Sequence, residues 1–443
     1  MSRDAKSNIQ RITSILKGFD AVNTPRRTQD ILDDLGTTRS TGFGLLRALS
    51  RAGWLERYDH GLVRLGPKAR GMAFAPLEAI EQSDTAKIRV TRGSTKQPRG
   101  IPDLEWDPAL VRTVETAKYR TKSPYRIGFA NASVSNAWRR AMQESLAYAQ
   151  KTNRQQISGV LVADAADDPV RQREQVETLV AEGIDILLIS TASVADKDLS
   201  NRLKDLADEG LPIVAVDRRP NDRSSLTAFV TASDHRIGRI SALWLAEHLK
   251  GQGRVWMLSG LEGASPAIRR QQAALSVLSQ FPGIQVEFVS HTDWTPESGL
   301  LTIGRLLDDA GRPPDGVWCD SGLQGIGSVQ QFLRRNLSVP AHSGGDLNGM
   351  YKLCLEKKVP MVALDYPASM GARALEVALD ILHGQPVPQR VEVPVQIILP
   401  RGLETQSVRA DTWAELHVQW ALDDDAILSQ GPALQLNEGK VAS

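Results

Sequence analysis

Cysteine is scarce in this sequence, since only Cys319 and Cys354 occur among 443 residues. Two cysteines cannot build a disulfide framework or a four-cysteine zinc site, and we therefore expect a reducing, cytoplasmic location. Long apolar runs are absent too: stretches such as 186–189 fall far short of the ~20 residues of a membrane span, and no apolar signal core follows Met1. We expect no contact with a membrane.

The motifs of common catalytic centres are also missing. The chain has no Gly-x-Ser-x-Gly elbow, no Walker phosphate loop and no His-Glu-x-x-His, and its 7 histidines do not cluster at ligand spacing. We therefore expect no enzymatic activity, no metal and no cofactor. What is present, 41% apolar and 24% charged residues, is typical of a soluble globular chain.

Charge is distributed unevenly. Residues 1–75 hold 13 Lys and Arg against 7 Asp and Glu, whereas residues 125–443 hold 31 against 38. A basic module joined to a larger acidic one suggests a part that faces nucleic acid, although a solvated surface can carry the same charge.

The basic module reads as three helices and a hairpin. Apolar residues at spacings of three and four predict a helix over 9–19, and capping residues and glycines bound two more over 28–36 and 37–53. Alternating strands follow at 54–57 and 62–66. This order predicts a small α+β winged-helix domain over residues 1–75.

The first turn of the third helix has the chemistry that reads DNA, because it combines an arginine with hydroxyl groups at a helix N-terminus. Arginines on later turns and on the hairpin could reach bases or phosphates. The alternative is a small helical domain with arginines on a wet face. The candidate DNA-binding residues are Thr38, Arg39, Ser40, Thr41, Arg47 and Arg64.

Residues 8–72, with NIQRITSILKGFD and LGTTRSTGFGLLRALSRAGWLERYDHGLVRLGP, resemble the winged-helix DNA-binding domain of IclR-type regulators. The resemblance implies that Arg39, Ser40 and Thr41 contact DNA. Gly42 and Gly44 lie within the predicted third helix, where glycine destabilises a helix by roughly 1 kcal/mol relative to alanine. Residues 76–124 then read as a flexible linker, with a helix over 108–119 and a basic run at 89–99 that is either connector or a second DNA contact.

From Tyr125 strands and helices alternate, and the rhythm restarts at Ser233. Repeated strand-helix units predict parallel sheets flanked by helices, here an α/β domain of two lobes over residues 125–405. Such sheets bind ligands at the carboxyl ends of their strands. Residues 406–443 form a tail, in which 413–430 predicts a helix that packs on the body or on a partner.

Polar residues follow the predicted strands, including an Asp-Tyr pair at 365–366. Carboxylates, an amide and arginines offer the donors and acceptors that vicinal hydroxyls need, and Trp138 offers a flat face for a sugar ring. The alternative for Asp217 and Asp346 is that they only cap strand-to-loop turns. The candidate ligand-binding residues are Asn136, Trp138, Arg139, Asp217, Arg218, Arg270, Ser321, Asp346 and Asp365, with Arg269 as the alternative to Arg270.

The motifs IGFANASVSNAWRRAM, AVDRRP, SGGDLNG and VALDYPASMGARALEVALDILHG make residues 125–405 resemble the periplasmic sugar-binding fold of ribose- and galactose-type proteins, also the sensor of LacI-family repressors. The resemblance implies a cleft that binds a sugar or polyol. Ser321, Arg139 and Asp365 depart from the family's usual residues, so the sugar's identity stays open.

Both parts together predict a DNA-binding transcription regulator, with repression favoured, whose affinity for operator DNA depends on a sugar or polyol effector. We expect a homodimer or larger homo-oligomer on double-stranded DNA. The alternative is a solute-binding protein for sugar uptake without a regulatory role.

Overall fold

The computed structural model describes residues 15, 26–35, 39–51, 54–57, 62–65, 89–90, 112–400, 402–408 and 418–436. The chain divides into two units, Met1–Thr85 and Ala86–Ser443. Each unit has a hydrophobic core of its own. Within the described ranges no helix is long and apolar enough to cross a membrane.

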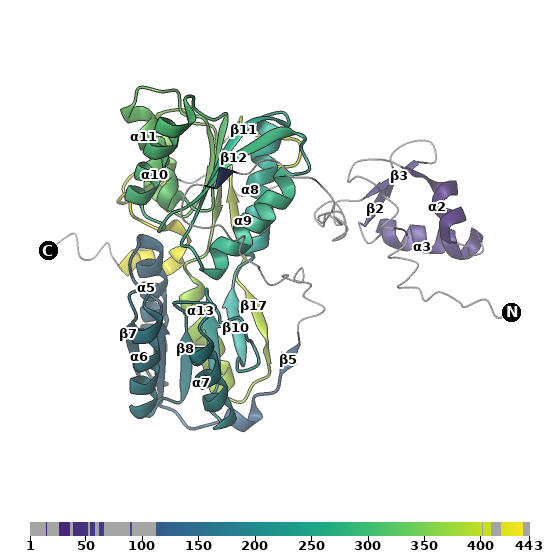
Figure 1. Ribbon diagram of the computed structural model, residues 1–443. Helices are drawn as coiled ribbons and strands as arrows, with labels where there is room; N and C mark the ends of the chain where they lie inside the picture. The colour runs from purple at the N-terminus through teal and green to yellow at the C-terminus, as the bar shows by residue number, and fades with distance from the viewer. Residues whose placement is uncertain are drawn as a thin grey trace. The chain divides into compact units, whose positions relative to one another are not determined.

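Where its residues are described, the first unit combines two helices with a small antiparallel sheet (Figure 1). Its elements are β1 Arg26–Arg27, α2 Thr28–Leu35, α3 Arg39–Arg51, β2 Leu55–Arg57 and β3 Leu62–Leu65, with the strands in the order β1-β3-β2. Apolar side chains from both helices and the hairpin bury together because their spacing places them on one side of each element. The buried set is Ile15, Ile31, Leu32, Leu35, Leu46, Leu49, Leu55 and Val63.

The second and third predicted helices and the two predicted strands are present in this unit, and β1 was not expected. The predicted helix over 9–19 and the candidate Thr38 lie outside the described residues, apart from the buried Ile15. Thr41 and Arg47 are exposed on α3, where the Nε of Arg47 donates to the carbonyl of Phe43 at 3.3 Å. The side chains of Arg39, Ser40 and Arg64 are not described.

The second unit is an α/β body of two lobes, one above the other in Figure 1. Lobe 1 is built on a six-stranded parallel sheet in the order β17-β10-β9-β8-β6-β7. Its elements are β5 Thr113–Val114, the 3-10 turn η3 Ala117–Tyr119, β6 Tyr125–Asn131, α5 Ala137–Thr152, β7 Ile157–Asp164, α6 Pro169–Ala181, β8 Ile186–Ile189, α7 Lys197–Asp208, β9 Ile213–Val216, β10 Ala228–Thr231, α13 Met370–Leu382, β16 Val387–Pro388 and β17 Arg390–Glu392.

Lobe 2 holds a seven-stranded sheet in the order β18-β15-β14-β13-β11-β12-β4, parallel except for β18. Its elements are β4 Arg89–Val90, α8 Asp234–His248, β11 Gln252–Ser259, α9 Ser265–Leu278, β12 Gly283–His291, α10 Pro296–Ala310, β13 Gly316–Cys319, α11 Gly322–Arg334, β14 Ala341–Gly344, α12 Asn348–Glu356, β15 Met361–Asp365 and β18 Gln396–Ile398.

From β6 to β18 the chain passes between the lobes three times, after β10, after β15 and after β17. Central strands such as β8 and β9 are apolar and almost fully buried, because helices cover both faces of a parallel sheet. Side-chain caps fix where the helices begin: Asn136, Asp168 and Asp196 each accept a hydrogen bond from the first turn that they precede. The expected two-lobed parallel α/β fold is confirmed.

Two predicted helices are wrong where the structure describes them. Within the predicted helix over 108–119, β5 pairs with β16, and the Arg112 carbonyl accepts from the Gln389 amide at 2.8 Å. Within the tail, 418–427 forms turns and only η5, Leu428–Leu436, is a 3-10 segment. In both places contacts with distant parts of the chain override a local helical pattern. Similarly, Arg89–Val90 of the predicted linker adds β4 to the edge of lobe 2.

Candidate functional site

A cavity lies at the carboxyl ends of the strands and draws its walls from both lobes. Lobe 1 contributes the start of α5 and the residues after β9, and lobe 2 contributes α9, α11 and the loops after β12 and β14. The lining residues are Asn136, Trp138, Arg139, Asp217, Arg218, Pro266, Arg270, Trp294, Ser321, Leu323, Asp346 and Tyr366.

Eight of the nine candidate ligand-binding residues from the sequence line this cavity. Asp365 does not: its Oδ1 accepts from the backbone amide of Asp346 at 2.9 Å and supports the loop from behind. Of the two alternative arginines, Arg270 lines the cavity and Arg269 does not.

The first turn of α5 carries three of the lining residues. Asn136 caps the helix, its Oδ1 accepting from the Arg139 amide at 2.9 Å, so this side chain has a structural role besides facing the cavity. The indole of Trp138 donates to the carbonyl of Tyr366 at 2.8 Å, and the two rings lie 5.1 Å apart between centroids. These contacts form an aromatic wall of the cavity. It joins lobe 1 to the segment after β15, the second crossing between the lobes, which carries Tyr366.

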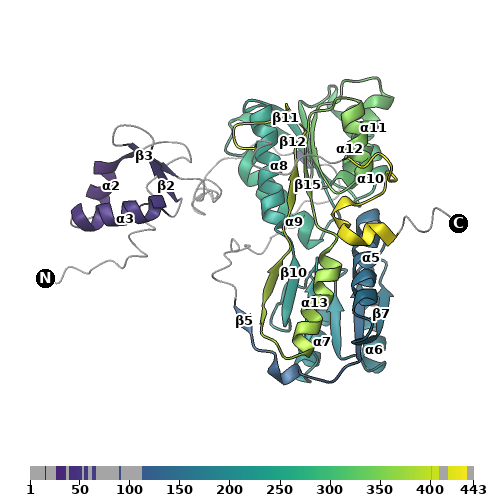
Figure 2. The same ribbon diagram turned by 180° about the vertical axis from the view of Figure 1, so that it is seen from behind.

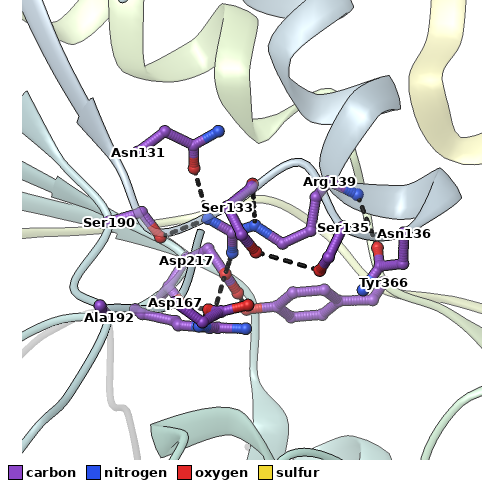
Figure 3. Close-up of polar contacts among 12 residues, drawn as sticks. Asn131, Ser133, Ser135, Asn136, Arg139, Asp167, Ser190, Ala192, Asp217 and Tyr366 are labelled. Carbon is purple, nitrogen blue, oxygen red and sulfur yellow. Dashed lines mark hydrogen bonds and ion pairs between the residues drawn. The ribbon is translucent and has the colours of Figure 1, made fainter. Parts of the chain in front are cut away.

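Arg139 is buried beneath this wall and is held by four acceptors (Figure 3). Its Nη1 lies 2.5 Å from Asp217 Oδ2, Nη2 donates to Asn131 at 2.5 Å and to Ser190 at 2.9 Å, and Nε donates to the Ser133 carbonyl at 2.9 Å. Burial, together with the nearby Arg218 guanidinium, lowers the pKa of Arg139 to about 10. The side chain is still charged at neutral pH, so it forms a buried ion pair with Asp217.

Asp217 and Arg218 form the turn that ends β9. Asp217 has φ 61°, a left-handed conformation that aspartate tolerates better than most residues, and its second oxygen accepts from the Tyr366 hydroxyl at 3.0 Å. Arg218 donates from Nη1 to Asp167 at 2.7 Å, and its guanidinium lies 5.5 Å from the centroid of Trp294. This cation–π contact brings the two lobes together across the cavity.

Arg270 projects from α9 on the opposite wall. Its Nε donates to Asp234 at 2.9 Å and its Nη1 to the Asp320 carbonyl at 3.1 Å, while its guanidinium lies 4.2 Å from the centroid of Tyr366. Burial alone would lower the pKa of Arg270, but the nearby carboxylates of Asp234 and Asp320 outweigh this effect and raise the pKa. The group is therefore a fixed positive donor.

Asp346 faces the same space from the loop after β14, with φ 74°. Ser321 donates to its Oδ2 at 3.1 Å, and the Tyr366 amide donates to its Oδ1. Burial, reinforced by the Asp365 carboxylate, raises the pKa of Asp346 to about 8. The raised pKa favours the protonated form of this carboxyl group, which can donate as well as accept a hydrogen bond.

The sequence interpretation missed Pro266, Trp294 and Leu323, and it placed Tyr366 only at a strand end. Trp294 follows β12 by three residues, so the strand-end argument could have found it. Its indole donates to Asp320 at 3.0 Å. A Cβ atom added to Gly260 would lie only 1.8 Å from the nearest atom of the Trp294 ring. Only glycine at 260 admits this ring.

The arrangement suits binding rather than bond breaking. Two indole rings, three arginines, two carboxyl groups and a tyrosine hydroxyl surround a small space, and the ionisable groups are tied to protein partners. Across the described ranges, no group of three or more His, Cys, Asp and Glu side chains could hold a metal ion.

The chain belongs to the periplasmic binding protein domain family, whose model matches residues 127–386, more than half of the chain. It is 22% identical over 277 residues to the ribose import binding protein of Bacillus subtilis, covering 62% of this chain and 88% of the relative. It is also 22% identical over 258 residues to the D-xylose-binding periplasmic protein of Escherichia coli, covering 54% and 77%.

Solved structures agree on the fold. An ABC transporter solute binding protein from Bacillus halodurans with bound myo-inositol matches with a TM-score of 0.58 and 18% identity, over 64% of this chain and 97% of that one. The expected resemblance to sugar-binding proteins is confirmed, and the matched family model, residues 127–386, does not reach the segment expected to be an IclR-type domain.

These findings contradict the expected DNA-binding transcription regulator and its operator partner. The relatives are sugar-binding proteins of import systems, which favours the alternative of a solute-binding protein. The expected cytoplasmic location is likewise overturned, because the relatives include a periplasmic protein. The prediction was wrong because regulatory sensors and transport proteins have the same two-lobed fold and the same kind of ligand cleft. The choice between regulator and transport protein therefore depended on the basic N-terminal segment, whose charge is not specific to DNA.

Proposed function

We propose that this protein binds a monosaccharide-sized sugar or polyol between its lobes and serves sugar uptake as a solute-binding protein, without catalysis. The observation that carries this proposal is the cavity between the lobes, which has indole rings on both sides and arginine and carboxyl groups around it. Trp138 comes from lobe 1 and Trp294 from lobe 2, and flat aromatic faces suit the C–H faces of a sugar. The names of the relatives, which mention ribose and D-xylose, support the same class.

The roles that we propose for the polar groups follow from their free hydrogen-bonding capacity. Arg218 and Arg270 each use some of their N–H groups on protein acceptors, and Asp346 has lone pairs left beyond its two partners. These three side chains would bind ligand hydroxyls. Arg139 and Asp365 would act indirectly, by holding Asp217 and Asp346.

A thermal-shift and calorimetry panel tests this function. It compares D-ribose, D-xylose, xylitol and myo-inositol with the disaccharide sucrose, each at a high concentration, because saturation at 100 times Kd stabilises by ~2.7 kcal/mol. We expect at least one of the monosaccharides or polyols to bind and sucrose not to bind. A Trp294→Ala variant should lose that binding, while Trp420→Ala, which removes an exposed indole outside the cavity, should keep it.

We also propose that residues 1–75 form a winged-helix fold, that 76–124 connect it to the sugar-binding domain 125–405, and that 406–443 form a C-terminal tail. The order α2, α3, β2, β3 and the shared apolar core support the winged helix. Circular dichroism of residues 1–85 expressed alone tests it: we expect cooperative thermal unfolding, and a non-cooperative, unstructured signal would contradict the proposal.

A further inference from the structure

The C-terminal residues 418–436, which we call the strap, contact both lobes and the second crossing between them. Figure 2 shows this segment at the junction of the lobes, beside α5. The strap lies beyond the matched family region, which ends at residue 386, and none of its residues lines the cavity.

One anchor of the strap is on lobe 2. The side chain of Asn348 donates to the carbonyls of Gln419 at 2.9 Å and Asp423 at 3.2 Å, and its backbone amide donates to Ala426 at 3.0 Å. The amide of Gly349 donates to the Asp424 carbonyl at 2.8 Å. Since Asn348 is fully buried, these bonds fix the start of α12 to the strap.

The other anchor is on lobe 1. Gln430, which is 3% exposed, donates from Nε2 to the Glu144 carboxylate on α5 at 2.7 Å. Helix α5 also packs against η5, in which Ala433 is buried.

Between these anchors the strap holds the crossing that carries Tyr366. The hydroxyl of Ser429 donates to the Tyr366 carbonyl at 2.9 Å and accepts from the Ala368 amide at 3.1 Å. The same Tyr366 carbonyl accepts from the indole of Trp138, a wall of the cavity. The strap therefore forms a hydrogen bond with Tyr366, a residue that lines the cavity.

We propose that the strap is a positioning element of the binding cleft: by clasping α5 of lobe 1 and α12 of lobe 2, it fixes the separation of the lobes and the place of Tyr366. A change in the angle between the lobes moves α5 relative to α12. It must then break an anchor or deform the strap, so the strap stabilises the lobe arrangement described above. This inference does not depend on which ligand the cleft takes.

Spin-label distances between the lobes test the strap in the full-length chain. Labels at Glu174→Cys on α6 and Asp309→Cys on α10 occupy exposed positions, and the native Cys319 and Cys354 are buried. Asn348→Ala removes the side-chain hydrogen bonds of the lobe 2 anchor, and Gln430→Ala removes the hydrogen bond to Glu144 on lobe 1. Ser407→Ala is the matched control, because Ser407 belongs to the same tail but bonds only to Glu247 of lobe 2.

We expect each anchor variant to add a second interlobe distance population, and the control to keep the parent distribution. Thermal unfolding is measured in parallel. If the anchor variants lower Tm but keep the parent distances, the strap only adds stability and the proposal is overturned. If Asn348→Ala fails to fold, Gln430→Ala decides the question alone, because it removes a single hydrogen bond at the edge of α5.

Discussion

The Nη1 atom of Arg139 lies 2.5 Å from the Oδ2 atom of Asp217, and the two side chains are only 2% and 4% exposed. This ion pair connects the first helix of the sugar-binding domain to the turn after β9. The other oxygen of Asp217 accepts from Tyr366, on the crossing between the lobes. One carboxylate thus connects three segments that are far apart in the sequence.

Replacing Arg139 with methionine should destabilise the protein strongly, because it leaves the Asp217 charge buried without its main partner. Loss of one member of a buried pair costs ~3–5 kcal/mol. The matched control is Arg202→Met, which removes the surface pair of Arg202 with Glu177 and should cost ~0.2–1 kcal/mol. Urea unfolding measures both free energies, and equal losses would contradict the structural role of the buried pair.

The carboxyl group of Asp346 should make stability depend on pH. Burial and Asp365 raise its folded pKa to about 8, well above its value in the unfolded chain. Between the two values the folded state binds more protons, so this group's contribution is full at low pH and falls as pH rises toward 8.

Asp346→Asn tests this dependence, because asparagine keeps the shape of the side chain and tolerates a positive φ. We expect the difference in unfolding free energy, parent minus variant, to decrease steadily from pH 5 to pH 8. Parallel pH profiles of the two proteins would show that Asp346 does not titrate in this range.

Both cysteine thiols should be inert in the folded protein. Cys319 and Cys354 are buried, and burial raises the pKa of Cys354 to about 12 and that of Cys319 as well. A thiol reagent that needs the thiolate should therefore react with neither in native buffer at pH 8, and with both in denaturant. Fast labelling of the native protein would mean that one of these sites opens to solvent.

Helices α10 and α11 approach so closely at Gly327 that a Cβ there would stand 1.8 Å from the Pro296 carbonyl oxygen. Gly327→Ala should therefore destabilise lobe 2 by ~1–3 kcal/mol, the usual cost of overpacking. Gly159→Ala is the control, since a Cβ at this position in β7 would meet nothing within 4 Å. That change should be neutral or stabilise by up to ~1 kcal/mol, and denaturant midpoints compare the two.

Local patterns in the sequence predicted most strands and helices of the two lobes. Buried strands such as β8 and β9 are short apolar runs between turn residues, and helices such as α5 begin directly after a polar capping residue. Strands β10, β16 and β17 were missed because pairing with distant strands, not local pattern, defines them.

Most of the candidate residues line one cavity for a physical reason: parallel strands bring their carboxyl ends to one edge, so residues after several strands meet. The sequence allowed two roles for Asp217 and Asp346, in a turn or in the ligand site. In the structure both residues lie in turns with positive φ and also line the cavity. Asp365 was misplaced because adjacent residues at a strand end face opposite sides, and here Tyr366 takes the cavity side. The strap could not be predicted, because its anchors are lone side chains on distant helices.

The positive φ values of Asp217 and Asp346 limit how ligand preference can be redesigned or can drift. Most residues are strained in this conformation, so substitutions at these two positions are effectively confined to asparagine and glycine. Trp294, with φ 52°, likewise resists β-branched replacements. Ser321 has an extended backbone, with φ −154°, and is free of this restriction. Libraries for a new sugar specificity should therefore vary Ser321 and Leu323 first and leave both aspartates unchanged.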